Sequence, residues 1–404
     1  MKILWVSCLA WNDEGKYRLP VNGAGAVSGS LFQQSMIEGL EELGHEVDIV
    51  GDYPHAPGKI VNKSFDWSHR VGSQDVAIKS VNAPYVSLLF KEFYLLRALK
   101  KQIKHKSYDV VIAYLIHQPY MKAIACAKRK IKNMNSVIIC PDLPNMMDMS
   151  LNEKFLKRML KKVDAYRIER LYKYIDGFVL FAKKMREQIP IHNRPYTVIE
   201  GVATVEKLDT SPVAKEKFIM HAGTLHKNIG IENIIDSMKY IEDKNVKLKI
   251  FGTGELSPFI EECAEKDPRI EFFGFVSREE LFDYQKKAIA LVNARNPEDD
   301  FTKYSFPSKT FEYLYSGTPF VSTWLEGYPD EYKKHLFVIP DNKPETIAHA
   351  INEIMGSQDD ELACMSQKAR EFIIKEKNAR AQGMKLHRFL LTLKGESDAS
   401  KVNQ

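Results

Sequence analysis

The chain has 404 residues, of which 44% are hydrophobic and 27% charged. A single hydrophobic core usually stops growing at about 250 to 300 residues, so this length predicts two domains. The net charge of +5 is too small to indicate a nucleic-acid-binding protein, and no segment has the run of about 20 apolar residues that a membrane-spanning helix requires.

The amino-terminal segment and the cysteines favour a cytoplasmic protein. Residues 1–11 are largely apolar, but Asp13 and Glu14 follow and no small-residue cleavage site is present. We therefore expect a first β-strand and not a signal peptide. The five cysteines are an odd number without a close pair, which fits neither a disulfide framework nor a zinc site.

The first half opens with a β–α–β unit. Residues 2–7 predict a buried strand, followed by a glycine-rich loop and by a helix from about residue 30 to residue 43. Gly44 stands where a glycine commonly ends a helix, and residues 47–50 return as the next strand. Such a unit begins a doubly wound parallel sheet.

Short apolar runs predict more strands of the same kind in both halves. We expect them at residues 109–113, 136–140, 177–181, 218–221, 246–251, 270–273, 288–293 and 319–322. Residues 193–217 contain two prolines and resemble a connection between domains. The predicted fold class is α/β, with two Rossmann-like domains over residues 1–195 and 205–370 whose parallel sheets face each other across a cleft. A helix over residues 371–393 and a disordered tail over 394–404 complete the chain.

Residues 304–319 carry the clearest chemical signal. Pro307 suits the first position of a helix that a glycine ends. The backbone N–H groups of Ser308 and Lys309 would then be free at the positive end of the helix dipole, which favours a diphosphate. Glu312 follows one turn later, where its carboxylate would accept hydrogen bonds from two ribose hydroxyls. The alternative is an ordinary capped helix with Glu312 as a solvated surface residue.

This segment resembles the retaining glycosyltransferases of family 4, also called group 1, which have the GT-B fold. In many members a Glu, seven further residues and a second Glu precede a small-Gly-x-Pro turn. Glu312 and the turn at residues 316–319 match the second Glu, which holds the donor ribose, whereas Tyr304 occupies the first Glu position. A bacterial subgroup starts this helix with Phe-Pro-Ser-Lys, as residues 306–309 do here. The acidic run at residues 298–300 either replaces the missing carboxylate or is a solvated loop.

Other segments fit the same resemblance in chain order. Residues 221–230 are similar to the loop where Arg and Lys meet the donor diphosphate in the family; Thr224 stands at the Arg position and Lys227 keeps the Lys. Ser28 and Gly29 fall where the family places a tight Gly-Gly turn beside the phosphate. The resemblance therefore implies that these four residues bind the donor.

The family's second domain also supplies contacts to the nucleotide base. Gly252 lies in a Gly-x-Gly turn that resembles the family's strand-to-helix turn. Phe275 and Val276 lie at the matching end of a strand whose backbone contacts the base. We expect all three residues to line the donor site.

Two polar residues follow predicted strands of the first half and are the candidate catalytic residues. His117 comes after residues 109–113, and Asp142 after residues 136–140. The family often has an active-site His at about this second strand end. Either side chain would orient or deprotonate the acceptor hydroxyl; the alternative for each is to cap a nearby turn.

The resemblance implies transfer of a hexosyl unit from a nucleoside diphosphate sugar to a sugar hydroxyl of a growing glycan, with retention of configuration, in surface polysaccharide biosynthesis. The first domain would bind the acceptor, a glycan or a lipid-linked saccharide, and the second the donor, a UDP-sugar or alternatively a GDP-sugar. The terminal helix would return toward the first domain. No cofactor and no metal ion is expected, because the helix dipole and lysine charge would neutralise the diphosphate.

Other functions on the same fold stay open. Tyr304 and Thr224, which replace a Glu and an Arg of the family, favour as an alternative a non-catalytic protein that binds or stabilises a partner. Another GT-B enzyme, such as a nucleotide-sugar epimerase or a phosphorylase, is a further alternative.

Basic residues concentrate in the first half of the chain, notably at residues 154–173. Within residues 155–166 an apolar face that includes Met159 and Val163 is flanked by lysines and an arginine, which is the form of a helix lying on an anionic membrane. Such contact would place the protein at the inner face of the cell membrane. The alternative is a helix that faces the core with solvated lysines.

Overall fold

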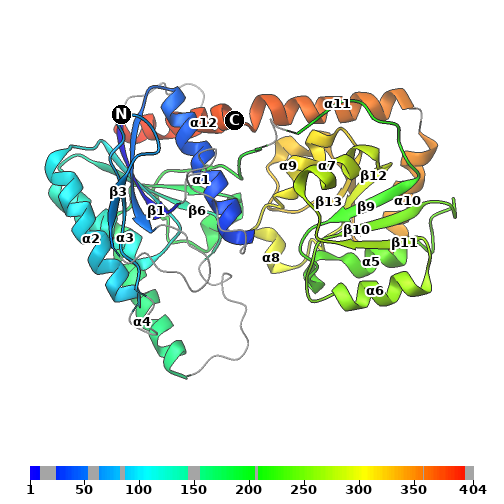
Figure 1. The fold of residues 1–404 in the computed structure, drawn as a ribbon, viewed down its shortest axis with the longest axis horizontal. Coiled ribbons are helices and arrows are strands. Elements are labelled where there is room, and N and C mark those ends of the chain that lie inside the picture. Colours follow the sequence, from blue (N-terminus) through cyan, green and yellow to red (C-terminus); the bar gives the residue numbers. More distant parts are fainter. Residues whose placement is uncertain are drawn as a thin grey trace. The chain divides into compact units, whose positions relative to one another are not determined.

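The computed structural model describes residues 1–9, 24–52, 63–81, 87–143, 155–204, 208–357 and 359–395. The chain divides into two compact α/β units (Figure 1). Unit 1 comprises Met1–Phe181, Met185–Val202 and Ala379–Gln404, and unit 2 comprises Ala182–Lys184 and Ala203–Asn378. The predicted disordered tail lies outside the described residues from residue 396 onward.

Unit 1 contains an eight-stranded sheet in the order β3-β4-β2-β1-β5-β6-β7-β8, in which only the β3–β4 pair is antiparallel. The strands are β1 (Lys2–Cys8), β2 (Glu46–Asp52), β3 (Phe65–Trp67), β4 (Asp75–Ala77), β5 (Val110–Tyr114), β6 (Asn135–Cys140), β7 (Gly177–Leu180) and β8 (Tyr196–Val198). Within residues 193–217, where we expected a connection between domains, β8 still pairs with β7, and the boundary between the units follows at Val202 and Ala203. The three residues of β8 are half-buried, as is usual at a sheet edge, so they lack the apolar run that marks a central strand.

The helices of unit 1 are α1 (Ala24–Glu42), α2 (Ser87–His105), α3 (Gln118–Lys130), α4 (Phe155–Leu171) and α12 (Ala379–Lys394), with a 3-10 turn η1 (Tyr172–Tyr174). A second 3-10 turn, η2, spans Lys183–Glu187. The terminal helix α12 packs against α1 through glycines (Figure 1). A Cβ atom on Gly39 would lie 2.2 Å from the carbonyl oxygen of Ala379, so this contact requires a glycine.

The start of α1 corrects one expectation. The helix begins at Ala24 and not near residue 30, so Ser28 and Gly29 lie inside a helix and do not form a tight turn. Gly29 faces the ring of Tyr114, whose Oη would lie 3.3 Å from a Cβ atom at that position. The expected turn came from the resemblance to the family and not from the residues themselves. The small residues at this position are compatible with a helix.

Unit 2 contains a six-stranded parallel sheet in the order β11-β10-β9-β12-β13-β14. The strands are β9 (Phe218–Ala222), β10 (Lys247–Phe251), β11 (Ile270–Gly274), β12 (Ala290–Asn293), β13 (Phe320–Thr323) and β14 (Phe337–Ile339). The helices are η3 (Lys227–Ile229), α5 (Ile231–Ser237), α6 (Ser257–Lys266), α7 (Arg278–Lys287), α8 (Asp300–Lys303), α9 (Lys309–Ser316), η4 (Asp330–His335), α10 (Pro344–Gly356) and α11 (Asp359–Glu376). This is the strand order of a doubly wound parallel sheet.

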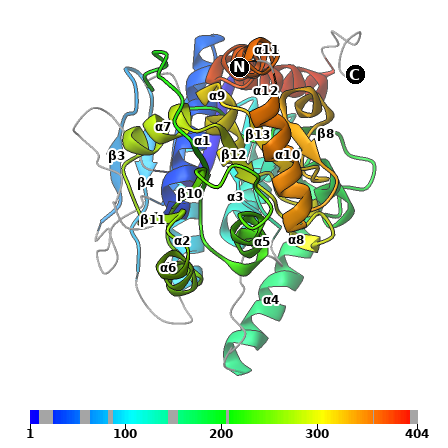
Figure 2. The ribbon, with the colours of Figure 1, turned by 90° about the vertical axis from the view of Figure 1, so that its right-hand side faces the viewer.

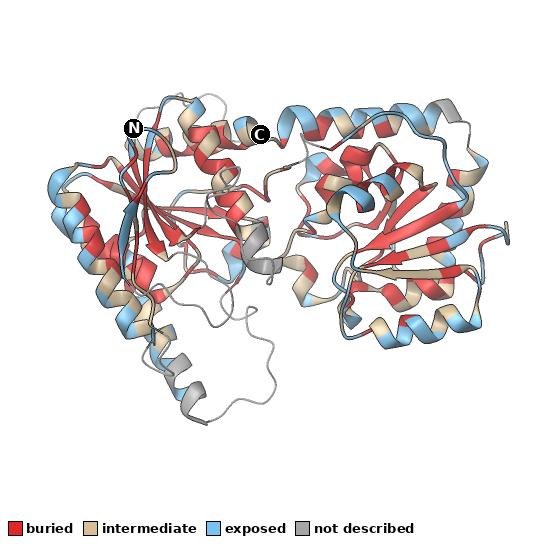
Figure 3. Cartoon of the chain, in the orientation of Figure 1, coloured by how far each residue is buried: buried red, intermediate tan, exposed pale blue. Residues whose placement is uncertain are grey.

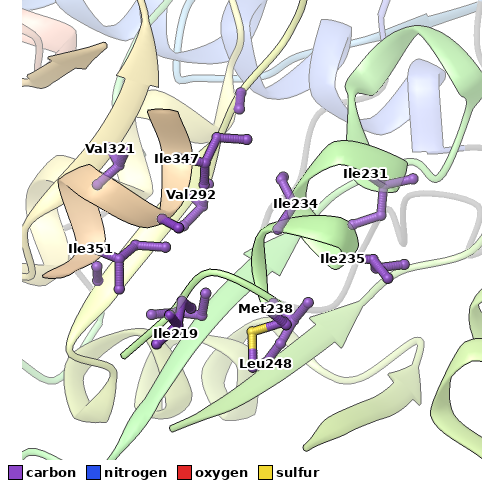
Figure 4. Close-up of a cluster of buried hydrophobic side chains, with 14 of the residues drawn as sticks. Ile219, Ile231, Ile234, Ile235, Met238, Leu248, Val292, Val321, Ile347 and Ile351 are labelled. Atoms are coloured by element: carbon purple, nitrogen blue, oxygen red, sulfur yellow. The ribbon is translucent and has the colours of Figure 1, made fainter. Parts of the chain in front are cut away.

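Alternating side chains of this sheet supply two cores, one on each face. Phe218 and Met220 of β9 pack into a largely aromatic cluster with residues of α7, α9 and α11. Ile219 between them points to the opposite face, toward Ile234 of α5 and Ile351 of α10 (Figure 4). The helices α5 and α10 lie side by side there (Figure 2). Buried residues line the strands in both units (Figure 3), so the register of each sheet is fixed. The parallel strands of each sheet have their carboxyl ends at one edge.

No helix among the described residues is both long and apolar enough to cross a membrane.

Candidate functional site

The strand order of unit 2 reverses between the neighbouring strands β9 and β12. Ligands of open α/β sheets bind beyond the carboxyl ends of the strands at such a switch point. His221 of β9 and Val292 of β12 join the two strands there, because the imidazole Nδ1 lies 2.9 Å from the Val292 carbonyl oxygen. The candidate donor site is therefore sought among the segments that follow these strands.

Glu312 lies in the first turn of α9 and forms ion pairs with two basic side chains. Its carboxylate oxygens lie 2.8 Å from Arg278 Nε and 3.0 Å from Lys309 Nζ. Burial alone would raise the pKa of Glu312, but the charges of Lys309 and Arg278 outweigh it and hold the pKa below its usual value. Glu312 is thus an ionised side chain that is only 15% exposed, and the solvated surface alternative is wrong.

Arg278 was missed by the sequence analysis. It is the first residue of α7, after the cap Ser277, and its guanidinium also donates a 2.7 Å hydrogen bond to the carbonyl oxygen of Thr204. Its partner Glu312 lies 34 residues away in the chain, so no local motif marks the pair. Only the shared edge of the sheet brings them together.

The start of α9 differs slightly from the expected one. The helix begins at Lys309, two positions after Pro307, and Ser308 is its N-terminal cap residue. It ends at Gly317, which has a left-handed backbone conformation. Ser308 is exposed, and its side chain makes no capping hydrogen bond. The backbone N–H groups of Ser308 and Lys309 have no partner among the described residues, so they remain available to an anion.

The loop after β9 presents Thr224 and Lys227, which are both exposed. The backbone N–H of Lys227 donates a 3.1 Å hydrogen bond to Glu255 Oε1, whereas its ammonium has no partner among the described residues. Gly252 lies close to this loop with a φ of 121°, and a Cβ atom there would come within 1.8 Å of the Gly223 carbonyl oxygen. Only glycine fits that position, which keeps the two turns in contact.

Three further residues expected at the donor site differ in exposure. Phe275, directly after β11, is 84% exposed. Val276 is partly buried against the aromatic core cluster. Tyr304 is partly buried and ends α8.

The two candidate catalytic residues of unit 1 both follow strand ends at the carboxyl edge of its sheet. His117 is the cap residue of α3, but its side chain makes no capping hydrogen bond and packs edge-on against Tyr120 at 4.9 Å. Burial and the nearby Lys91 lower the pKa of His117 to about 4, so its imidazole is neutral at pH 7. The expected alternative of a capping role is wrong for His117. Two positions earlier, Leu115 has a φ of 82°, which is a strained conformation for a branched side chain.

Asp142 follows β6 and is an exposed residue. The surrounding chain nevertheless desolvates its carboxyl group and raises the pKa of that group. Asp52, at the end of β2, was not predicted as a site residue from the sequence. Its carboxylate accepts hydrogen bonds from Tyr120 Oη at 2.7 Å and pairs with Lys91 Nζ at 2.8 Å. This pair lies close enough to His117 to influence its charge.

In the part of the chain that the structure describes, no three His, Cys, Asp or Glu side chains gather in a group that could hold a metal ion.

Comparisons with known proteins bear on unit 2 and on the fold. Residues 216–357 match the family model described as "Glycosyl transferases group 1". This part of unit 2 is therefore a glycosyl transferases group 1 domain. No curated protein sequence matches the chain.

Solved structures match nearly the whole chain. Sucrose-phosphate synthase from Thermosynechococcus elongatus has a TM-score of 0.65 and 14% identity, and the match covers 97% of this chain and 100% of that one. HepE from Anabaena in complex with UDP has a TM-score of 0.63 and 13% identity over 97% and 100% of the two chains. A glycosyltransferase from Rickettsia africae has a TM-score of 0.62 and 13% identity over 98% and 99%. At these identities the likeness shows the fold, and the predicted GT-B fold is confirmed.

Proposed function

We propose that the protein is a retaining glycosyltransferase that moves a hexosyl unit from a nucleoside diphosphate sugar to a sugar hydroxyl of a growing glycan. The observation that carries the proposal is the oriented, ionised Glu312 beside a helix start with free N–H groups. These features lie in the segment that matches glycosyl transferases group 1. Together they suit the ribose and the diphosphate of one donor.

Unit 2 would bind the donor. Arg278 and Lys309 fix the carboxylate of Glu312, whose remaining lone pairs accept hydrogen bonds from the ribose hydroxyls. Ser308 and Lys309 offer backbone N–H groups to the diphosphate, and the free ammonium of Lys227 adds positive charge. Negative charge that develops on the departing diphosphate is thereby stabilised without a metal ion.

The remaining residues expected at the donor site would contact the base and the transferred sugar. The base would lie near Phe275 and Val276, beyond the Gly252 turn, and the transferred sugar near Tyr304. A UDP-sugar is the proposed donor, supported by the UDP in the HepE structure, and a GDP-sugar is the alternative.

Unit 1 would bind the acceptor. The neutral imidazole of His117 has a lone pair for an acceptor hydroxyl proton, and Asp142 at the next strand end would orient the same hydroxyl. The switch point of this sheet lies between β1 and β5, and His117 follows β5.

The first test is a thermal-shift screen of the purified chain with UDP, GDP, dTDP, CDP and ADP, with and without magnesium. A ligand that binds only the folded state raises the apparent melting temperature. A rise with one nucleotide that magnesium does not change supports a metal-free donor site. No rise with any nucleotide would instead favour the partner-stabilising alternative.

The second test is product analysis with the matching nucleotide sugar and a saccharide acceptor. NMR of the new glycosidic linkage must show the anomeric configuration of the donor. Inversion would reject the retaining mechanism. Turnover without an acceptor would indicate an epimerase, and dependence on inorganic phosphate a phosphorylase.

We also propose that α2 and α4 contact an anionic membrane, at the inner face of the cell membrane. Half-exposed apolar side chains gather on these helices: Leu89, Phe90 and Phe93 on α2, and Met159, Val163 and Tyr166 on α4. Arg167 of α4 pairs with Glu92 of α2, so the two helices are neighbours. Met159 and Val163 are 50% and 54% exposed, so the alternative of a core-facing helix is wrong for them.

Lipid would cover this apolar surface while flanking basic residues such as Lys162 meet anionic headgroups. Such contact suits a lipid-linked acceptor. Flotation with anionic and with neutral vesicles tests it, and we expect binding to the anionic vesicles. The variant Phe93→Ser should reduce that binding, and absence of the protein from both vesicle fractions would reject the membrane contact.

A further inference from the structure

Two buried nitrogen atoms at the switch point of unit 2 have no hydrogen-bond partner in the part of the chain that the structure describes. His221, in β9, is 2% exposed; its Nδ1 donates to the Val292 carbonyl oxygen, and its Nε2 is buried without a hydrogen bond among the described residues. Arg295 follows β12 by two residues, and its Nε is likewise buried and unpartnered. Buried polar groups are nearly always hydrogen-bonded, so these two atoms offer hydrogen-bonding positions to a ligand at this sheet edge.

None of the described residues compensates the charge of Arg295. No ion pair or hydrogen bond involves its guanidinium among the described residues, and the centroid of the Phe301 ring lies 5.7 Å from its Cζ. The two nearby tyrosines offer no free acceptor, because Tyr313 Oη bonds the backbone of Ala222 and Tyr328 Oη faces the hydroxyls of Thr310 and Ser322. A guanidinium stays ionised at physiological pH, so an anionic ligand would neutralise this buried positive charge.

Other groups around Arg295 suit the same ligand. Arg295 and Lys309 both act on the charge of His221, so all three side chains are neighbours. Burial lowers the pKa of His221 to about 4. Its imidazole is therefore neutral, and since Nδ1 donates to Val292, Nε2 carries a lone pair that accepts from a hydroxyl. Arg295 is partly exposed as a residue, so a ligand can reach it.

We propose that Arg295 binds an oxyanion of the donor at the switch point between β9 and β12, beside Lys309, and so supplies the arginine that the chain lacks at Thr224. This inference rests on the proposed donor site and names a further binding residue in it. The oxyanion has two sources, the β-phosphate of the nucleotide or the carboxylate of a hexuronosyl group. His221 Nε2 accepts a hydrogen bond from a hydroxyl of the same ligand.

The test is calorimetric titration of the full chain with UDP, UMP and inorganic pyrophosphate. In Arg295→Met we expect UDP and pyrophosphate to lose at least about tenfold in affinity, which is a typical loss for a charge-assisted contact. UMP, which has no β-phosphate, should change less. Arg295→Lys should keep part of the affinity because it keeps the charge. The exposed Arg380→Gln is the matched control and should bind as the wild type does.

The melting temperature of the ligand-free variant separates a binding role from a structural one. An apolar side chain in place of an uncompensated buried charge should raise the melting temperature of Arg295→Met above that of the wild type. A fall would indicate that Arg295 supports the fold. The proposal would then be overturned if the folded fraction of Arg295→Met bound UDP and pyrophosphate as the wild type does.

The remaining outcomes separate the two sources and the two proposals. If Arg295→Met binds UDP as the wild type does but loses a preference for UDP-glucuronate over UDP-glucose, the oxyanion is the sugar carboxylate. Binding of pyrophosphate that depends on Arg295, without binding of any nucleotide, would reject the proposed donor function and retain the anion site. The site itself is overturned if Arg295→Met binds every probe as the wild type does, or if the wild type binds none.

Discussion

Arg278 Nε lies 2.8 Å from Glu312 Oε1, and the two residues come from the first turns of two different helices. Lys309 holds the other carboxylate oxygen at 3.0 Å. Each oxygen of a carboxylate has two lone pairs, so both cations together leave acceptor capacity for a diol. The ion pairs therefore orient Glu312 for a ligand and do not block it.

Replacement of Glu312 by Ala should weaken binding of a nucleoside diphosphate by about 1 to 3 kcal/mol, because a charged hydrogen-bond partner of the ribose is lost. This corresponds to a factor of roughly 5 to 150 in the dissociation constant. Calorimetric titration with UDP measures it. Glu279→Ala, at an exposed position of α7, is the matched control. Unchanged affinity in a folded Glu312→Ala variant would remove Glu312 from the ribose site.

Two glycines at neighbouring strand ends allow steric contact to be separated from backbone conformation. Gly252 and Gly274 both have positive φ, at 121° and 65°. A Cβ atom would meet the Gly223 carbonyl oxygen at 1.8 Å in the first case and nothing within 4 Å in the second. Gly274→Ala should cost about 1 to 2 kcal/mol of unfolding free energy for its left-handed backbone alone.

Gly252→Ala adds a clash with backbone atoms to that conformational cost. We therefore expect it to lower the free energy of unfolding by about 4 kcal/mol or more, the range of exceptional single substitutions. Urea denaturation of the two variants checks the order. Equal losses would mean that the loop after β9 moves away freely and does not pack on Gly252.

The parts of the fold that could be predicted from sequence are those with a local signal. The apolar run of β9 and the proline and glycine around α9 mark their elements without any tertiary information. The strands β3, β4 and β8 are only three residues long, too short to show such a run, and β3 and β8 lie at the edges of the sheet.

The same distinction holds for the candidate site. Glu312 and Lys309 lie within one helical turn, and a helix start is visible in the sequence. Arg278 is identified by its ion pair with a residue distant in the chain, and Arg295 by a buried nitrogen without a hydrogen-bond partner among the described residues. Their surrounding sequence is that of an ordinary helix start and an ordinary loop, so sequence reasoning could not select them.

A buried histidine in unit 1 predicts a pH dependence of stability. His69 lies 2.7 Å from Asp75 and 3.1 Å from Glu41. Burial alone would lower the pKa of His69, but the hydrogen bonds to the two carboxylates outweigh it and raise the pKa to about 9. Because the pKa of His69 is higher in the folded than in the unfolded protein, protonated His69 stabilises the fold. This stabilisation is fully present below about pH 6.5 and is lost as the pH rises through 9.

His69→Gln should therefore lower the free energy of unfolding by about 2 to 3 kcal/mol at pH 6, and by progressively less as the pH rises from 6.5 to 9. Urea titrations of wild type and variant at pH 6, 7.5 and 9 measure the difference. The exposed His349→Gln should show no such trend. A difference that stays constant with pH would mean that the charge of His69 does not stabilise unit 1.

The last prediction separates the two candidate catalytic residues. If His117 takes the proton of the acceptor hydroxyl, His117→Gln should lower kcat by about 10² to 10⁴. The dissociation constant of the nucleotide should stay within about twofold of the wild type, because the donor residues lie in unit 2. Asp142→Asn should raise KM for the acceptor if Asp142 only orients the hydroxyl.

The pH profile gives an independent readout of the same assignment. Because burial and Lys91 lower the pKa of His117 to about 4, its lone pair is available down to near that pH. The acid limb of kcat/KM should therefore fall near pH 4 in the wild type and disappear in His117→Gln. A limb that persists in His117→Gln and disappears in Asp142→Asn would transfer the role of base to Asp142, whose carboxyl pKa is raised by desolvation and would then set the limb.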